Sequence, residues 1–322
     1  MNLSNNVVVV DSGCDLPSEF IQNNPIRKVP LNYVVNGQVY LDTLSTTERL
    51  HAYINDTFNL RKSVMSMETT PEQMRQFIVS EIAPSFDSCH VQTISAARSL
   101  THKNWLDSLI QLKHCGREAR LQADPRSRFN FRLKNTGTLF TGQGVIAAHT
   151  ADLIKQGLEA SRIRKEIDML IPTVRAYSVP QDVDYLRIRA NQKGDRSVNA
   201  LVAKMAKQFE ILPIIKGYQD ESKPVAKVRG RHKAINSLMS YAIARLQNLT
   251  SPYIVISYAG ALSDLTKYEK YNDLKTLAKW EGVVVLETVM NLAGGLNLGP
   301  GAVCLALATH CNRLNFDSAE KE

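Results

Sequence analysis

The sequence predicts an α/β protein of two domains. Its 322 residues are enough for two domains of ordinary size with a substantial buried core. Short β-branched runs alternate with amphipathic stretches along the chain, a pattern typical of α/β architecture. The pattern is interrupted at Pro172 and then resumes. We therefore expect an N-terminal domain over residues 1–172 with a parallel sheet, and a C-terminal domain over 173–322 with a mixed sheet.

The first elements have specific local signals. Val7–Val10 is a continuous β-branched run, typical of a strand buried on both faces of a parallel sheet. A second strand is predicted over 29–35, and Asn36-Gly37 predicts a hairpin turn into a strand at 38–41. A helix over 72–82 is predicted to start at Thr69-Thr70-Pro71, where a threonine N-cap precedes proline at the first helical position.

The other elements follow from the same patterns. The rest of the first half is predicted to contain a strand at 90–94 and helices at 99–112, 145–157 and 162–170. The second half is predicted to contain strands at 174–179, 211–216, 224–228, 252–258 and 282–287 and helices at 197–208, 233–246 and 268–280. Asp220-Glu221-Ser222 predicts a turn, and we expect the polar tail at 317–322 to be frayed.

Composition excludes several classes of protein. The only apolar run near the N-terminus is four valines long, too short for a signal peptide, and no apolar stretch approaches the length of a membrane span. The sequence thus predicts a cytoplasmic protein without membrane insertion. The five cysteines form no CxxC pair, and neither HExxH nor a phosphate-binding GxxxxGK[ST] or GxGxxG motif occurs. We expect no metal and no cofactor.

The formal net charge of +8 favours anionic partners. Its basic residues gather at 117–132, which also contains Phe129 and Phe131, and at 223–233, which contains no Phe, Tyr or Trp. Both clusters are interpreted as solvated loops, and we expect no nucleic acid partner.

Eight short motifs occur in a fixed order along nearly the whole chain. They are Asp11-Ser12-Gly13-Cys14-Asp15-Leu16-Pro17, Val29-Pro30-Leu31 with Asn36-Gly37, Ser66-Met67-Glu68-Thr69-Thr70-Pro71, Ile94-Ser95-Ala96 with Ser99 and Thr101, Gly142-Gln143-Gly144, Gly194-Asp195-Arg196, Lys227-Val228-Arg229-Gly230-Arg231 and Gly299-Pro300-Gly301. Each motif is weak alone, but in this order they resemble the DegV family.

The resemblance implies two α/β domains with a fatty acid in an apolar tunnel between them. In the family, hydroxyl groups and a histidine hold the carboxylate, and a separate ATP-using kinase subunit phosphorylates it. Carried over to this chain, the implied ligand-binding residues are Ser66, Met67, Ser95, Ala96, Asn297, Leu298 and Gly299. The basic residues Lys227, Arg229 and Arg231 would face the kinase subunit.

Hydroxyl donors suit this role because a buried carboxylate must be hydrogen-bonded or it will be neutralised. Ser66 and Thr69-Thr70 precede a helix start, where free N–H groups add to the site, and Ser95 ends a strand. For Thr70, helix capping alone explains the residue equally well.

The chain departs from the family pattern at its headgroup motifs. Asn297-Leu298 stands where the family has His-Thr, and Met67 and Glu68 replace a hydroxyl residue and a glutamine. Asn297 cannot carry charge, and Glu68 would repel an ionised carboxylate. The alternatives to a fatty acid are therefore a neutral lipid, an ester or another amphiphile, or a pocket that has lost ligand binding.

Two other functions remain as alternatives. In a stand-alone enzyme, Cys14 would be the nucleophile and Glu68 the base, with a depressed thiol pKa. In a regulatory protein with a vestigial pocket, large side chains would fill the tunnel.

Overall fold

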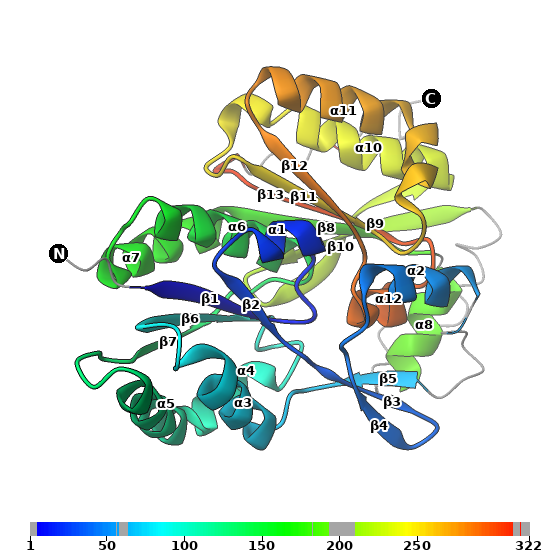
Figure 1. Cartoon of the computed structure of the whole chain (residues 1–322). Helices are drawn as coiled ribbons and strands as arrows, with labels where there is room; N and C mark the ends of the chain where they lie inside the picture. Colours follow the sequence, from blue (N-terminus) through cyan, green and yellow to red (C-terminus); the bar gives the residue numbers. More distant parts are fainter. Residues whose placement is uncertain are drawn as a thin grey trace.

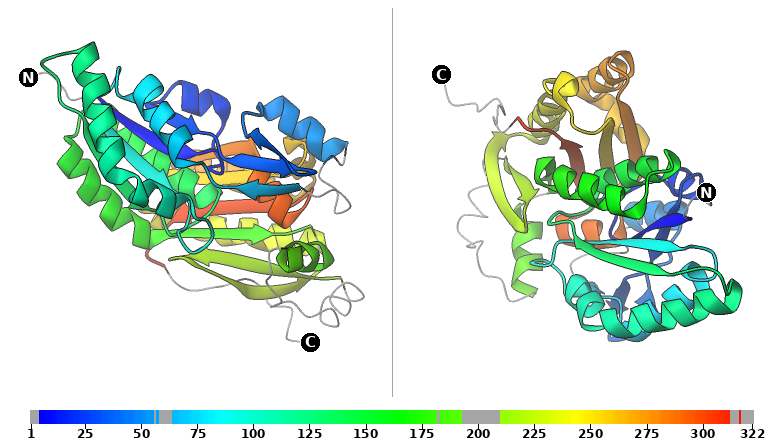
Figure 2. Two further views of the ribbon diagram at one scale, coloured as in Figure 1. Left: turned by 90° about the horizontal axis from the view of Figure 1, so that it is seen from below. Right: turned by 90° about the vertical axis from the view of Figure 1, so that its left-hand side faces the viewer.

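The computed structural model describes residues 5–55, 57, 64–181, 183–192, 210–311 and 316. They form a two-domain α/β fold in which helices and sheets alternate as layers (Figures 1 and 2). From one side to the other, the layers are helices α3–α5, a parallel sheet, helices α6 and α7, a mixed sheet, and helices α10 and α11. None of the described helices is both long and apolar enough to cross a membrane.

The parallel sheet has the strand order β2-β1-β6-β7. Its strands are β1 (Asn6–Asp11), β2 (Ile26–Val29), β6 (Ser88–Thr93) and β7 (Asn130–Asn135). Val7 and Val9 pack toward α3–α5, whereas Val8 and Val10 pack toward α6. This alternation explains why four consecutive valines form a strand, since helices cover both faces.

The second sheet has the order β10-β9-β8-β13-β11-β12, in which only the β11–β12 pair is parallel. Its strands are β8 (Val174–Val179), β9 (Ile211–Tyr218), β10 (Glu221–Arg229), β11 (Tyr253–Tyr258), β12 (Val284–Val289) and β13 (Val303–Ala308). The strands of the parallel sheet all precede Pro172, and those of the mixed sheet all follow it. The exact domain boundary remains a prediction.

A small antiparallel sheet, ordered β4-β3-β5, lies beside both domains. Its strands are β3 (Asn32–Val35), β4 (Gln38–Leu41) and β5 (Val64–Met67). The helices are α1 (Ser18–Gln22), α2 (Thr46–Ile54), α3 (Pro71–Phe77, extended by a π-helical turn at Ile78–Ile82), α4 (Thr101–Asp107), α5 (Leu109–Ala123), α6 (Thr141–Lys155), α7 (Ala160–Leu170), α8 (Val183–Gln192), α10 (Arg231–Ile243), α11 (Glu269–Trp280) and α12 (Leu292–Leu298).

Helix α6 joins the two domains. It packs against β1 of the parallel sheet and against β8, β11 and β13 of the mixed sheet. Gly144 permits this close approach, because a Cβ atom there would lie 2.3 Å from the backbone oxygen of Asp15. The Gly142-Gln143-Gly144 motif therefore serves helix packing rather than phosphate binding.

Two predicted elements are each divided into two in the structure. The single strand at 29–35 is broken at Pro30, which lacks an N–H group, so that β2 and β3 belong to different sheets. The helix at 99–112 is divided at Ser108 into α4 and α5.

The interpretation of both basic clusters as loops was also wrong. Residues 117–123 belong to α5 and 130–132 to β7, while 223–229 lie in β10 and 231–233 in α10. The sequence analysis missed β5, β7, β13 and helices α1, α2, α8 and α12. The helix predicted at 197–208, the motif at 194–196 and the tail at 317–322 lie outside the described residues.

Candidate ligand cavity between the domains

A cavity of about 510 Å³ lies between the two domains. Segments from both halves of the chain line it, and most of its wall is apolar. The first half contributes Leu31, Ile94, Leu139 and Phe140, and the second half contributes Leu186, Ile215, Ala293 and Leu298. The volume lies within the range of small-molecule sites.

The cavity brings together predicted ligand residues that are far apart in sequence. Ser66 and Met67 from β5 and Asn297 and Leu298 from α12 all line it. These residues are about 230 positions apart, yet α12 packs directly against β5. The fold therefore joins two of the headgroup motifs at one site.

The other three predicted residues are not part of the lining. Ser95 is buried next to it, between the lining residues Ile94 and Ala97, and the backbone N–H of Ala96 donates to Asn135 Oδ1 at 3.1 Å. Gly299 ends α12 with a φ of 93°, a conformation that favours glycine.

Helix α12 fixes Asn297 at the cavity wall. The helix starts at Asn291, whose side chain accepts from the N–H of Gly294 at 2.8 Å. Asn297 Nδ2 donates to the carbonyl of Ala293 at 2.6 Å, one helical turn back. One of its two amide protons is therefore committed to the helix, and the other proton and the carbonyl oxygen are left for a ligand.

Two arginines add positive charge that the sequence analysis did not assign. Arg98 and Arg189 both line the cavity. Arg189 Nη1 donates to the carbonyl of Val64 at 2.8 Å, which orients its guanidinium group from α8. Arg98 could have been noticed three residues after Ser95, but Arg189 could not, because α8 was not predicted.

Glu68 brings a negative charge to the same cavity. Its Oε1 accepts from the backbone N–H of Leu100 at 3.3 Å. The carboxylate is thus anchored at the start of α4. Its neighbour Thr69 is fully buried and donates to the carbonyl of Pro30 at 2.9 Å, while Thr70 caps α3, so both threonines have structural roles.

Asp11 at the end of β1 and Asp15 in the loop that follows support the cavity from outside. Asp11 accepts hydrogen bonds from the N–H groups of Ile94 and Gly13 and from Gln143 Nε2, at 3.0–3.1 Å. Burial raises the pKa of Asp11, and these donors oppose that shift. Since neither Asp11 nor Asp15 lines the cavity, Asp11 positions Ile94 rather than contacting a ligand.

Cys14 lacks the properties of a nucleophile. Its side chain has no exposed surface, and burial raises the pKa of its thiol well above the usual value. A catalytic cysteine needs the opposite shift, because the thiolate is the reactive form. The structure therefore argues against the enzyme alternative that rests on Cys14.

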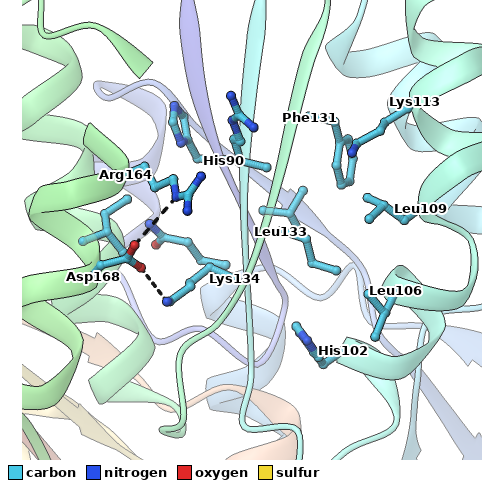
Figure 3. Close-up of a pocket in the computed structure, with 14 residues that line it drawn as sticks. His90, His102, Leu106, Leu109, Lys113, Phe131, Leu133, Lys134, Arg164 and Asp168 are labelled. Carbon is cyan, nitrogen blue, oxygen red and sulfur yellow. Dashed lines mark ion pairs between the residues drawn. The ribbon is translucent and has the colours of Figure 1, made fainter. Parts of the chain in front are cut away.

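A second hollow of about 350 Å³ runs along β7, the edge strand of the parallel sheet (Figure 3). Lys134 Nζ lies 2.5 Å from Asp168 Oδ1, and Arg164 lies on the other side of the same carboxylate at 3.7 Å. None of the predicted ligand residues lines this hollow. Lys134 and Arg164 therefore already pair with Asp168 across the sheet edge.

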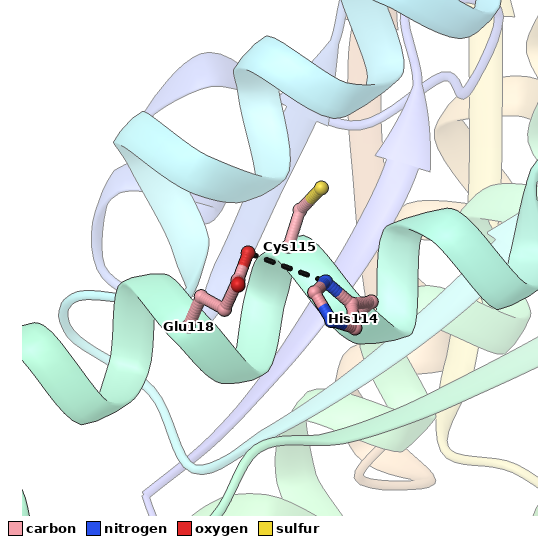
Figure 4. Close-up of side chains that lie close together, drawn as sticks. All are labelled: His114, Cys115 and Glu118. Carbon is pink, nitrogen blue, oxygen red and sulfur yellow. Dashed lines mark ion pairs between the residues drawn. The ribbon is translucent and has the colours of Figure 1, made fainter.

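His114, Cys115 and Glu118 place potential metal ligands within 4.8 Å of one another (Figure 4). All three come from α5, where His114 and Glu118 are exposed and form an ion pair at 3.2 Å. Figure 4 shows the Cys115 sulfur directed away from this pair. An exposed pair one helical turn apart needs no ion, so we assign no metal here.

The predicted partner-binding residues differ in their exposure to solvent. Lys227 and Arg229 are exposed on β10. Arg231 is half-buried, and its guanidinium donates to the carbonyl of Pro180 at 3.2 Å and to that of Gly301. Arg231 therefore braces the Gly-Pro-Gly turn, whereas Lys227 and Arg229 are accessible.

Comparison with known proteins agrees with this architecture. The family model described as "Uncharacterised protein, DegV family" matches residues 6–310. A DegV domain-containing protein of Xanthomonas campestris is 32% identical over 308 residues, covering 94% of this chain and 96% of that protein.

Solved structures share the fold at lower identity. A stearic acid-binding protein from Eubacterium ventriosum superposes with a TM-score of 0.71 at 18% identity, covering 94% of this chain and 97% of the other. A DegV lipid binding protein from Thermotoga maritima gives a TM-score of 0.70 at 18% identity, with 95% and 99% covered.

Proposed function

Because this chain belongs to the DegV family, we propose that it binds a fatty acid in the cavity between its two domains. One observation carries the proposal: Ser66 and Met67 from one half of the chain and Asn297 and Leu298 from the other line a single cavity. The solved relatives described as fatty acid-binding or lipid binding proteins have the same fold. The proposed role is binding rather than catalysis.

The chemistry of the cavity suits an amphiphile. Leu31, Leu139 and Ile215 offer an apolar surface for an acyl chain, whose burial contributes about 0.8 kcal/mol per CH₂ group. Ser66 and Asn297 offer donors for a headgroup. The cavity is not filled by large side chains, contrary to the expectation for a vestigial pocket.

The two arginines can supply the positive charge that Asn297 lacks in place of the family's histidine. Arg98 and Arg189 place positive charge in the lining, and Glu68 is the acidic residue among the described residues that line it. This balance favours an anionic headgroup even though Asn297 is uncharged. We therefore propose a carboxylate rather than a neutral headgroup, with Arg98 as its counter-ion.

The proposal extends to a partner. Lys227 and Arg229, both exposed on β10, would steer an acidic surface of an ATP-using kinase subunit toward the loaded protein. That subunit would phosphorylate the presented carboxylate, which places the activity in the cytoplasm, where ATP is available. A fatty acid kinase subunit should convert palmitate bound to the wild type into palmitoyl phosphate. This product should be lost in the double variant Lys227→Glu/Arg229→Glu. Equal rates of its formation with the wild type and the double variant would contradict the role of Lys227 and Arg229.

Mass spectrometry tests the ligand proposal. The purified protein is analysed under native and then denaturing conditions, and released lipid is extracted and identified. We expect near-stoichiometric fatty acid from the wild type and none from Ala293→Phe, which fills the cavity. Ala123→Phe on the exposed face of α5 is the matched control. An apo mass that persists after incubation with palmitate would refute fatty acid binding.

A further inference from the structure

The turn of the β9–β10 hairpin reaches across the domain interface to Ser95. Asp220 Oδ1 accepts from the Ser95 hydroxyl at 2.6 Å, and Asp220 Oδ2 accepts from Asn135 Nδ2 at 2.8 Å. The backbone N–H of Asp220 also donates to the carbonyl of Gly137 at 2.8 Å. A residue of the C-terminal half therefore makes three hydrogen bonds to the end of β7 and to the loops that follow β6 and β7.

The same hairpin forms one wall of the cavity. Ile215 and Gly217 from β9 and Ser222 from β10 belong to the lining. The Ser222 carbonyl also accepts a long hydrogen bond, 3.4 Å, from Arg98 Nη2 on the opposite wall. The contacts of Asp220 thus hold this wall closed against the N-terminal domain.

The turn has an unusual backbone. Gln219 and Asp220 have φ values of 49° and 64°, so both central residues are left-handed although neither is glycine. Such turns match the twist of a hairpin but normally use asparagine, aspartate or glycine. Aspartate is therefore acceptable at position 220, and asparagine or glycine would keep the turn.

Ser95 is buried beside the cavity rather than in its lining, and Asp220 holds the hydroxyl that a ligand carboxylate would need there. A serine hydroxyl has one proton to donate, and Ser95 gives it to Asp220. A second carboxylate at the same hydroxyl would face both the loss of this donor and repulsion from Asp220. The Ser95 hydroxyl can therefore serve either Asp220 or a ligand headgroup, but not both.

We infer that Asp220 determines which headgroup the cavity accepts: its carboxylate holds Ser95 until an anionic lipid headgroup takes its place. The inference rests on the proposed fatty acid binding and adds the regulation of that site. Asp220 is only partly buried, so its carboxylate returns to water when displaced. An uncharged ester has no comparable acceptor and leaves the hairpin docked.

Competition between the ligand and Asp220 predicts that removing the Asp220 carboxylate raises the affinity for an anionic lipid selectively. In Asp220→Gly and Asp220→Asn, the affinity for palmitate should rise about tenfold, because the ligand no longer displaces a charge-assisted hydrogen bond. The affinity for methyl palmitate should change by less than about twofold. Glu221→Ala removes a carboxylate from the same hairpin whose ion-pair partner among the described residues is the exposed Lys223, and should resemble the wild type for both lipids.

If the wild type and both Asp220 variants bound palmitate with equal affinity, this inference would be overturned but the proposed fatty acid binding would stand. An equal gain for palmitate and methyl palmitate would overturn it too, because charge would then play no part. If no variant and no wild-type protein bound palmitate, the proposed function would fail and this inference with it.

Hydrogen–deuterium exchange gives a second readout that does not depend on affinity. Palmitate should accelerate exchange of the Asp220 amide, because its bond to Gly137 is lost when the turn is released. Methyl palmitate should leave that exchange unchanged. Slower or unchanged exchange of this amide in saturating palmitate would show that the hairpin stays docked, and would overturn the inference.

Discussion

Asp15 and Asn291 join the two domains through a pair of buried hydrogen bonds between residues 276 positions apart. The backbone N–H and the side-chain Nδ2 of Asn291 both donate to Asp15 Oδ1, at 2.8 and 2.9 Å. Ser257 Oγ donates to the other carboxylate oxygen at 2.5 Å. Burial raises the pKa of Asp15, while these donors oppose the shift. The same Asn291 caps α12 and so positions Asn297 at the cavity.

Removing the Asp15 carboxylate should destabilise the protein. Asp15→Ala leaves the donors of Ser257 and Asn291 buried without an acceptor, and we expect the free energy of unfolding in urea to fall by about 3 kcal/mol. Asp15→Asn should cost less, because the Ser257 hydroxyl can rotate to accept from the new amide. Asp107→Ala, at an exposed ion pair, is the control and should cost under about 1 kcal/mol. Equal losses in Asp15→Ala and Asp107→Ala would contradict this assignment.

Gly144→Ala should destabilise the junction between α6 and the Asp15 loop. Alanine favours a helix over glycine by about 1 kcal/mol, but its Cβ would lie 2.3 Å from a backbone oxygen that cannot rotate away. We expect a net loss of about 2 kcal/mol in the free energy of unfolding. Gly217→Ala provides a comparison, since its Cβ would meet no atom within 4 Å. A neutral or stabilising Gly144→Ala would refute the steric argument.

Restoring the family's histidine should strengthen carboxylate binding. In Asn297→His, a protonated imidazole would add a charge-assisted hydrogen bond, and we expect palmitate affinity at pH 6.5 to rise about fivefold. The gain should fade as the pH rises above about 8, because the imidazole loses its proton. Isothermal calorimetry at both pH values measures it, with Asn297→Gln as the uncharged control. A gain of equal size at both pH values would exclude a charge effect.

His90 should make folding stability depend on pH. Burial, assisted by the charge of Arg132, lowers the pKa of His90 from 6.5 to about 4. Between these pH values the unfolded chain binds a proton at His90 that the folded chain does not. The contribution of His90 to the free energy of unfolding is therefore complete above pH 6.5 and is lost as the pH falls toward 4.

Urea titrations between pH 7 and 4.5 test this dependence. His90→Gln should reduce the slope of unfolding free energy against pH by up to about 1.4 kcal/mol per unit in this range. His90→Asn separates the loss of the titrating ring from changes in shape, and should reduce the slope equally. A slope that both variants leave unchanged would contradict the shifted pKa.

The sequence by itself determined the two-domain α/β class and the family. Local signals sufficed for elements that depend on near neighbours: the buried β1, the Asn36-Gly37 turn, and the Thr70-Pro71 start of α3. They failed where tertiary contacts decide the outcome. Strand β13 reads as an apolar run after a Gly-Pro-Gly turn, and becomes a strand because β8 and β11 pair with both of its edges.

Only the tertiary structure decided how the candidate site is built. The motifs predicted Ser66, Ser95 and Asn297 as neighbours, but they could not reveal that Asp220 holds the Ser95 hydroxyl or that Arg189 enters the cavity. These contacts join residues more than 100 positions apart, and no local propensity specifies them. They form because the β9–β10 hairpin and α8 fold back onto the N-terminal domain, where burial leaves each polar group needing a partner.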